Sequence, residues 1–443
     1  MKTSRPKNYF KIQFLLMRFL GLGWWHSPYE DDKRNFPGWY LYYSIVTQLV
    51  WVVGFVGLET IYPFVGEKDV DRFMFSLSFV ITHDLTLIKL YIFYFKNSEI
   101  QDIVRTLEVE LYQFYQNNEK NHATLRLTRI LTASFLFFGW ITIGNTNVYG
   151  TIQDLNWKTE VAQINDTSNW PPRTLPQPIY IPWKYQKEES YVLTFVLETV
   201  GLLWTGHIVM SIDTFIGSVI LHMSTQFKIL QESLSTAFDR TIEKMYKNAL
   251  NNNSPTDAID FDSKEAFVRA CYPINKIELE LEKTFKNCFR QQQVLIGCVD
   301  EFAKTYSYGF MTQLLSSMAA ICVVMVQVSH DASSLKSTRL VTSLAFFVVM
   351  IIQLALQCFT GNELTYQAGK VSQAVMRCKW ERVGVRLRRM LLLTMMRAQR
   401  PLRLTAGGFA YMNNDCFLAV RVEILYLSLL SITQQQFHLG AEK

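Results

Sequence analysis

The sequence predicts an all-α membrane protein with seven transmembrane helices, a cytoplasmic N-terminus and an extracellular C-terminus. Two observations predict this fold class. Apolar residues gather into runs of about 20, the length of helix that crosses about 30 Å of hydrocarbon, and Lys and Arg gather in alternate loops. The 443 residues are 49% hydrophobic. A large soluble protein also reaches that fraction, so the distribution of the apolar residues decides the class.

Seven apolar runs define the predicted spans. They are Tyr40–Ile61, Phe73–Phe95, Ile130–Tyr149, Tyr191–Met223, Leu295–Val328, Leu340–Phe359 and Asp415–Ile432. The chain then divides into a cytoplasmic N-terminal segment (1–39), spans one to four with an outer loop at 150–190 (40–225), cytoplasmic stalk helices (226–294), spans five and six (295–360), a cytoplasmic anchor helix and turn (361–412), the last span (413–433) and an extracellular tail (434–443).

Loop charges give the predicted orientation. The N-terminal segment contains Lys2, Arg5, Lys7, Lys11, Arg18, Lys33 and Arg34. The loop between spans six and seven contains Lys370, Arg377, Lys379, Arg382, Arg386, Arg388, Arg389, Arg397, Arg400 and Arg403. The first predicted outer loop has only Lys68 among acidic residues. Because an excess of Lys and Arg marks the cytoplasmic side, the N-terminus is predicted inside, and an odd number of spans places the C-terminus outside.

The N-terminal segment shows no secretory signal. The apolar stretch Phe14–Leu22 is short, contains Arg18 and is not followed by a small-residue cleavage site. We interpret it as an amphipathic helix that lies against the cytoplasmic face of the membrane. A short buried helix is the alternative.

The two longest loops have different compositions. The outer loop contains the glycosylation sequon at Asn165 and several prolines that exclude regular helix, so we interpret it as an ordered lid, with a loose solvated loop as the alternative. In the inner segment, Gln226–Leu250 and Lys264–Gln292 are predicted helices that extend spans four and five, and Asn251–Asp262 is a predicted disordered insert. Helical stalks of this kind suit subunit contacts; surface helices without a partner are the alternative.

The C-terminal third carries the most specific pattern. Its members in order are Trp380, a basic and apolar helix predicted at Val385–Met396, Gln399, Pro401, Thr405, Gly407, Gly408 and Tyr426 in the last span. Pro401 removes a backbone donor and stops the preceding helix. Gly407 and Gly408 permit a sharp turn. The chain can therefore pass from a cytoplasmic helix into a span.

This run resembles the C-terminal signature of the insect odorant receptor family, and Arg18, Gly21, Leu22 and Trp24 resemble the family's entry segment. The resemblance covers the whole chain in topology and is motif-specific over about Trp380–Leu430. It implies a tuning, odorant-specific subunit of an odorant-gated, non-selective cation channel in the plasma membrane of olfactory sensory neurons. Such a subunit forms a hetero-tetramer with a shared co-receptor, and each subunit contributes its final span to one pore.

The resemblance also assigns residues. The subunit anchor comprises the stalk helices with Trp380, Gln399, Pro401, Thr405 and Gly407. The pore-lining helix carries Leu425, Tyr426, Leu429 and Thr433, of which Leu429 is a candidate hydrophobic gate that blocks ions by dewetting; lipid or helix packing is its alternative role. Arg421 and Glu423 depart from the family, which has small or hydroxyl residues there, so each needs water or a separate partner.

The implied odorant pocket lies in the outer half of the bundle, among spans two to six. An apolar lining with few polar groups suits a small hydrophobic volatile. Candidate ligand-binding residues are Phe75, Phe79, His83, Phe138, Trp140, Thr142, Tyr149, Tyr191, Phe195 and Ser317. Core packing is the alternative role of each aromatic residue. His83 could instead form a structural pair with Asp84, and we expect Lys89 to extend toward the cytoplasm.

Other function classes find less support. A gustatory-type channel that works without a co-receptor carries Gln-Phe where this chain has Ile432 and Thr433, and a co-receptor itself would have a longer loop between spans four and five. A transporter would show internal repeats. The histidines are scattered and no Cys-x-x-Cys pair occurs, so we predict no enzyme activity, no cofactor and no metal site. Basic residues confined to loops argue against nucleic acid as a partner. The predicted partners are therefore the co-receptor, the volatile ligand, cations and membrane lipid.

Overall fold

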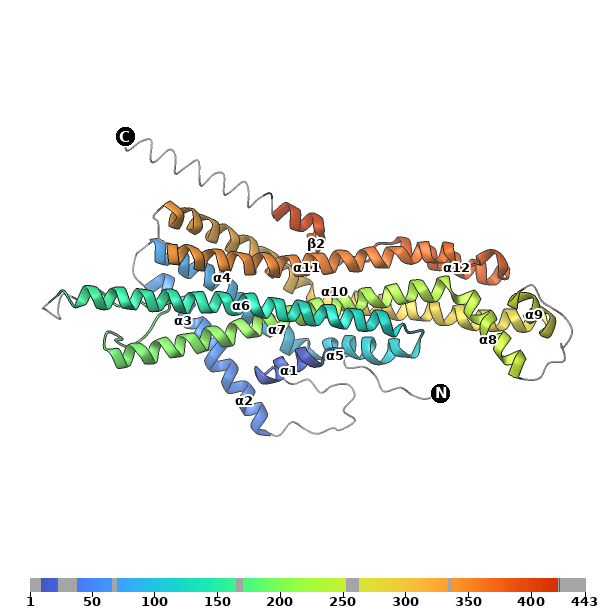
Figure 1. Ribbon diagram of the computed structural model, residues 1–443, viewed down its shortest axis with the longest axis horizontal. Coiled ribbons are helices and arrows are strands. Elements are labelled where there is room, and N and C mark those ends of the chain that lie inside the picture. The colour runs from blue at the N-terminus through green and yellow to red at the C-terminus, as the bar shows by residue number, and fades with distance from the viewer. Residues whose placement is uncertain are drawn as a thin grey trace.

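The computed structural model describes residues 9–22, 38–65, 70–164, 170–251, 263–333, 337–420 and 422. They form an elongated bundle whose longest helices lie side by side along one axis (Figure 1). The two ends of the bundle differ. We call the end with residues 170–187 the Pro-rich end, and the end with the helices at 237–251, 264–271 and 385–399 the stalk end.

Six helical segments are long and apolar enough to cross a membrane. They are α2 with η1 and α3 (Gly38–Gln48, Leu49–Gly54 and Phe55–Val65), α4 (Val70–Phe95), α6 (Asn118–Val161), α7 (Glu188–Ser235), α10 (Ile274–Ser333) and α11 (Ser337–Arg377). Each contains one of the first six predicted spans, which are therefore confirmed as helices. Of the seventh span, residues 415–420 are helical, and most of the rest lies outside the described residues.

Several helices extend well beyond the predicted spans. α6 has 44 residues, or about 66 Å at about 1.5 Å per residue, which is twice the thickness of the hydrocarbon. It continues to Val161, so the first part of the segment predicted as outer loop is helical; the helix-excluding prolines begin only at Pro171. α7 continues to Ser235 and α10 begins at Ile274, so both extend into the predicted stalk segment. Each of the two predicted stalk helices is broken, however, and their remaining parts form separate helices at Ala237–Asn251 and Lys264–Cys271.

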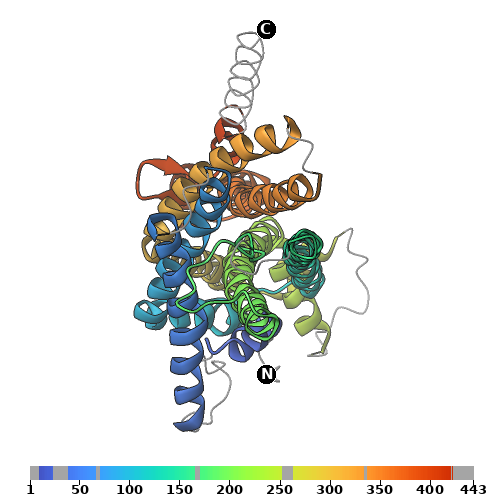
Figure 2. The same cartoon turned by 90° about the vertical axis from the view of Figure 1, so that its left-hand side faces the viewer.

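α7 is the central helix of the bundle. It packs most extensively against α11 and α6, and it also contacts α10 and α4; in Figure 2 it lies near the middle of the bundle. Its residues from Met210 to Ile220 are buried on every face. Small residues allow this close packing, since a Cβ on Gly201 would lie 2.3 Å from the Phe55 ring.

The N-terminal helix α1 (Lys11–Phe19) docks on α7. Met17 is fully buried, and the Gln13 amide donates a hydrogen bond of 3.0 Å to the Ser218 hydroxyl. Its opposite face is exposed at Leu15 and Phe19. The helix is thus amphipathic, as predicted, but its buried face contacts the bundle itself.

Short elements complete the fold. They are α5 (Asn97–Arg105), η2 (Thr106–Glu110), η3 (Leu111–Gln113), α8 (Ala237–Asn251), α9 (Lys264–Cys271), η5 (Trp380–Arg382), α12 (Val385–Gln399), β1 (Thr405–Ala406) and β2 (Ala410–Tyr411). Of the predicted insert Asn251–Asp262, Asn251 is the last residue of α8, and residues 252–262 lie outside the described residues.

The predicted turn before the last span is a small hairpin. α12 ends at Gln399, just before Pro401, and β1 pairs antiparallel with β2, with Thr405 opposite Tyr411. Gly407 and Gly408 have φ angles of 60° and 80°, in the left-handed region that favours glycine. Gly407 also lies so close to α10 that a Cβ would meet Met311 Sδ at 2.4 Å.

Candidate ligand-binding site

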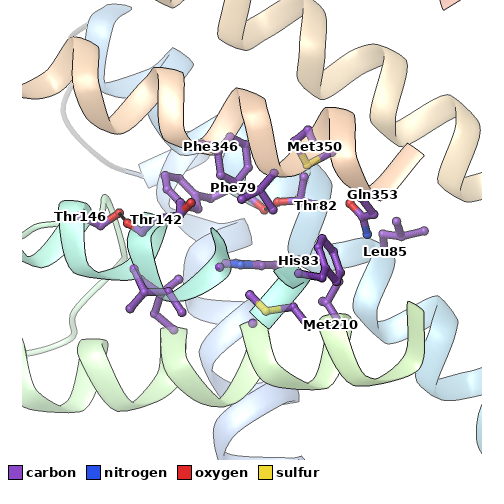
Figure 3. Close-up of a pocket in the computed structure, with 17 residues that line it drawn as sticks. Phe79, Thr82, His83, Leu85, Thr142, Thr146, Met210, Phe346, Met350 and Gln353 are labelled. Carbon is purple, nitrogen blue, oxygen red and sulfur yellow. Dashed lines mark hydrogen bonds between the residues drawn. The ribbon is translucent and has the colours of Figure 1, made fainter. Parts of the chain in front are cut away.

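A cavity lies inside the bundle, between α4, α6, α7 and α11 (Figure 3). It encloses about 650 Å³ of atom-free space, with the open solvent at its mouth included. Its lining is mostly aromatic and aliphatic, and includes Phe79, Phe135, Met210, Phe346 and Met350. Such a lining binds apolar molecules by removing their surface from water.

A glycine gives the cavity part of its shape. A Cβ on Gly139 of α6 would lie 1.9 Å from Met210 Cε and 2.4 Å from its Sδ. The Met210 thioether therefore rests against bare backbone. A side chain at position 139 would push the flexible Met210 side chain into another conformation. The wall of the cavity at this point therefore depends on the glycine.

The three threonines of the lining donate to their own helices. Thr82 Oγ1 donates to the Phe79 carbonyl at 2.9 Å, Thr142 to that of Phe138 at 3.1 Å, and Thr146 to that of Thr142 at 3.0 Å. Their hydroxyl hydrogens are thus in use within the helices. The other polar side chains of the lining are His83 and Gln353.

His83 is held by a buried carboxyl group of α3. Its Nδ1 lies 2.7 Å from Glu59 Oε2, and the two side chains are 8% and 1% exposed. The interpretation of a His83–Asp84 pair is wrong, because Asp84 instead accepts a hydrogen bond of 3.0 Å from Thr60 Oγ1. Adjacent residues of a helix point in different directions, so the partner of His83 comes from the neighbouring helix.

Gln353 connects the cavity to a buried ion pair. Lys89 Nζ lies 2.6 Å from Asp213 Oδ1, with side chains 4% and 0% exposed. The Gln353 amide donates to the other carboxylate oxygen of Asp213 and, at 3.3 Å, to Gln313 Oε1. The expectation that Lys89 extends toward the cytoplasm is wrong, since a buried lysine is held by a carboxylate across the bundle.

The candidate ligand-binding residues divide into three groups. Phe79, His83 and Thr142 line the cavity. Phe75 and Tyr149 pack behind it, with the Phe75 ring centre 5.2 Å from that of Phe79 and 6.1 Å from that of Tyr149. The remaining five do not line it.

Those five residues lie in four other places. Phe138 faces a shallow apolar groove between α6, α7 and α11. Trp140 is 57% exposed on the outer face of α6. Tyr191 and Phe195 pack in a cluster at the Pro-rich end, and Ser317 is buried on α10, where it accepts a hydrogen bond of 2.8 Å from Gln313.

Sequence reasoning missed the contributions of α7 and α11. Met210, Phe346, Met350 and Gln353 all line the cavity but were not candidates. For Gln353 a signal existed, because a polar side chain in the middle of an apolar span is costly unless it has a partner or a function.

The Pro-rich end is ordered around Arg173. Its guanidinium pairs with Asp154 at 2.6 Å and Glu188 at 2.7 Å, and it stacks over Tyr191 and Trp157 at 3.7 and 4.6 Å from the ring centres. The described part of the segment thus packs on α6 and α7, as an ordered loop should, but it contributes no residue to the cavity lining.

α11 joins the cavity to the start of the last helix. Phe359 follows Phe346 on α11 by between three and four helical turns. Its ring centre is 5.1 Å from that of Phe417. Two residues further along α11, a Cβ on Gly361 would lie 2.4 Å from the Met412 carbonyl oxygen. The helix that lines the cavity therefore contacts the residues on both sides of the turn into the last helix.

The other assigned residues are placed as follows. Trp380 begins η5 and is 43% exposed, and Gln399, Pro401, Thr405 and Gly407 lie at the end of α12 and in the hairpin. The pore residues Leu425, Tyr426, Leu429 and Thr433, the charged Arg421 and Glu423, and the sequon residue Asn165 lie outside the described residues.

Comparisons with known proteins agree with this fold. The sequence model of a family described as 7tm odorant receptor matches residues 69–421. Odorant receptor Or1 of Anopheles gambiae is 22% identical over 376 residues, which cover 83% of this chain and 81% of that protein. Odorant receptor 22c of Drosophila melanogaster is 19% identical over 324 residues, which cover 72% of this chain and 71% of that protein.

Solved structures show the same fold. The insect olfactory receptor OR5 from Machilis hrabei superposes with a TM-score of 0.67 at 12% identity, over 95% of this chain and 97% of that chain. The structure of that receptor in complex with eugenol superposes with a TM-score of 0.64 at 12% identity, over 96% and 97% of the two chains.

Proposed function

This chain belongs to the odorant receptor family, and on that premise we propose that it binds a small volatile in the cavity between α4, α6, α7 and α11 and thereby opens a cation pore. It is a multi-pass membrane protein of a family of receptors rather than enzymes. The observation that carries the proposal is the cavity of Figure 3, whose lining is mostly apolar with a few polar groups, as in small-molecule pockets. A related receptor has been solved with the volatile eugenol.

The route from cavity to pore is proposed to run along α11. Phe346, Met350 and Gln353 contact the cavity, and Phe359 and Gly361 of the same helix contact the turn into the last span. A ligand can shift an equilibrium only by binding one state better than the other. We propose that filling the cavity favours the α11 position in which the last spans separate.

The remaining parts of the proposal follow the family resemblance. The chain acts as a tuning subunit with a co-receptor in a hetero-tetramer, in the plasma membrane of olfactory sensory neurons. The N-terminus and the stalk end are cytoplasmic, because the basic residues of 361–412 mark that side of the membrane. Residues 413–433 line the shared pore with Leu429 as gate, and the stalk helices with α12 hold the subunits together.

Electrophysiology tests this proposal. Cells that express the chain with an odorant receptor co-receptor should show cation currents evoked by members of a volatile panel, and cells that express either protein alone should not. Currents from the chain alone would support a channel that needs no co-receptor. The absence of evoked current in every combination, with the chain present at the cell surface, would reject the channel function.

Gly139→Ala should weaken ligand binding without unfolding the protein. The added methyl group displaces the Met210 side chain, which lines the cavity, and so changes the shape of the cavity wall. We expect the half-maximal odorant concentration to rise about ten-fold, because one methylene in an apolar pocket changes affinity by about 1–3 kcal/mol.

The control is Gly144→Ala on the same helix, where a Cβ meets nothing within 4 Å. Concentration–response curves and surface labelling of both variants give the comparison. A similar rise for the control would contradict the role of Met210 in shaping the cavity.

A further inference from the structure

We propose that His83 presents an N–H donor to the cavity, so that this receptor selects volatiles whose oxygen accepts a hydrogen bond, such as ketones, esters or aldehydes, over hydrocarbons of the same shape. This inference deepens the proposed function, since it rests on the cavity being the ligand site. Two observations support it. Glu59 and His83 form a buried pair, and the edge of the imidazole that does not face Glu59 lies at the cavity.

The imidazole has one engaged edge and one free edge. Its Nδ1 is 2.7 Å from Glu59 Oε2. Glu59 lies on α3 and does not line the cavity, whereas His83 does. The edge turned toward the cavity is therefore the opposite one, which carries Nε2, and this nitrogen has no hydrogen-bond partner among the described residues. In Figure 3, His83 lies amid the lining residues, between Met210 and Phe79.

Four proton arrangements are open to this pair. In one, a carboxylic acid protonated on Oε1 accepts at Oε2 from Nδ1–H, which leaves a lone pair on Nε2 and a buried O–H unpaired, because Oε1 has no partner among the described residues. The other three pair every oxygen-bound hydrogen. A carboxylate can accept from a neutral imidazole protonated on Nδ1, which leaves a lone pair on Nε2 and a net charge of −1. A carboxylate can pair with an imidazolium, which leaves Nε2–H and no net charge. A carboxylic acid can donate to Nδ1, which also leaves Nε2–H and no net charge.

Burial favours the two neutral arrangements that leave no O–H unpaired. The Glu59 side chain is 1% exposed and that of His83 is 8% exposed, and Glu59 Oε1 has no hydrogen-bond partner among the described residues. A net charge at such a site is far costlier than a neutral pair. Both of these arrangements place a hydrogen on Nε2, so the cavity receives a donor in either case.

Neighbouring carboxyl groups strengthen this argument. Asp84 follows His83 in the chain, and Glu198 is buried on α7, close enough for its charge to act on that of Glu59. Arg72 is the basic group that acts on Glu198. Any negative charge on Asp84 or Glu198 makes a second uncompensated negative charge at Glu59 less favourable, so the proton remains within the Glu59–His83 pair.

A donor at this point changes ligand choice. The threonines of the lining already use their hydroxyl hydrogens, and the Gln353 amide hydrogens are directed to Asp213 and Gln313. An oxygen that accepts from His83 Nε2 satisfies a group which a hydrocarbon would leave unpaired. Leaving such a group unpaired is costly, and sites built to hydrogen-bond a ligand reject analogues that lack the matching atom.

The test compares isosteric ligands on the purified full-length chain in lipid nanodiscs. The probes are heptanone and octanone as methyl ketones, and the alkenes in which a methylene replaces the carbonyl oxygen. Binding is followed by ligand-induced thermal stabilisation, which does not require channel activity. We expect the ketones to bind about ten- to a hundred-fold more tightly than the matched alkenes.

Two variants identify the donor. In Glu59→Leu/His83→Leu both members of the pair become apolar, which avoids an unpaired buried carboxyl group. We expect the ratio of ketone to alkene affinity to fall to about one. His83→Gln retains an amide donor and should retain the ketone preference. Equal affinities in the unmodified protein, no stabilisation by either probe, or an equal loss of both in the double variant would overturn the inference.

Current recordings on the same probes separate this inference from the channel proposal. Stabilisation by ketones without evoked current would reject the channel function and keep the donor role of His83. Evoked currents of equal sensitivity to ketone and alkene would keep the channel function and reject the donor role of His83.

Discussion

Asp213→Ala should remove the protein from the cell surface. The substitution leaves the Lys89 ammonium, whose side chain is 4% exposed, without its carboxylate in the core of the bundle. Breaking a buried ion pair by removing one partner costs about 3–5 kcal/mol, a large part of the stability of an ordinary domain. Surface labelling and the thermal unfolding of the purified protein measure the effect.

Two further variants control this experiment. Lys89→Met/Asp213→Leu removes both charges together, and we expect it to recover most of the lost stability, because apolar replacement of a whole buried pair is often neutral. Glu243→Ala breaks the exposed pair with Lys264 and should leave unfolding unchanged. Unaltered unfolding of Asp213→Ala would show that the Lys89–Asp213 contact contributes little.

Gly361→Ala should abolish most of the ligand-evoked current while ligand binding persists. The added methyl group would lie 2.4 Å from the Met412 carbonyl oxygen, a backbone atom that no side-chain rotation can move away. α11 must then shift relative to the turn into the last helix. Overpacking of this kind costs about 1–3 kcal/mol, which is about ten-fold in an opening equilibrium.

Gly369→Ala on the same helix is the matched control, since a Cβ there meets nothing within 4 Å and alanine is the better helix former. Maximal current, surface labelling and ligand-induced thermal stabilisation are compared for the two variants. If Gly361→Ala keeps full current, the α11 contact does not transmit ligand binding to the pore.

The fold could be predicted from the sequence because its signals are local. Apolar runs predicted six helices. Pro401 predicted the end of α12, and Gly407 predicted the turn in which it adopts a left-handed conformation. Each depends on neighbouring residues only. Helix lengths were underestimated because the polar ends of α6, α7 and α10 continue in helical conformation beyond the hydrocarbon thickness that defines an apolar run.

The site depends on contacts between distant residues, which a single sequence does not specify. Lys89 and Asp213 are 124 residues apart, and nothing local indicates that they pair. Trp140 and Thr142 lie two positions apart on α6, yet Trp140 faces outward and Thr142 faces the cavity. A helix that is apolar on all sides in lipid gives no periodicity from which its inner face could be read.

The hairpin at 405–411 limits how the last helix can move. The Gly407 N–H donates to the Ser307 carbonyl oxygen at 3.0 Å, and the Met412 N–H donates to that of Leu404 at 2.9 Å. The residues just before the last helix are thereby tethered to α10 through the hairpin. In the channel that we propose, this tether opposes sliding of the helix and favours a tilt about residues 412–414, with only a small rearrangement at its base.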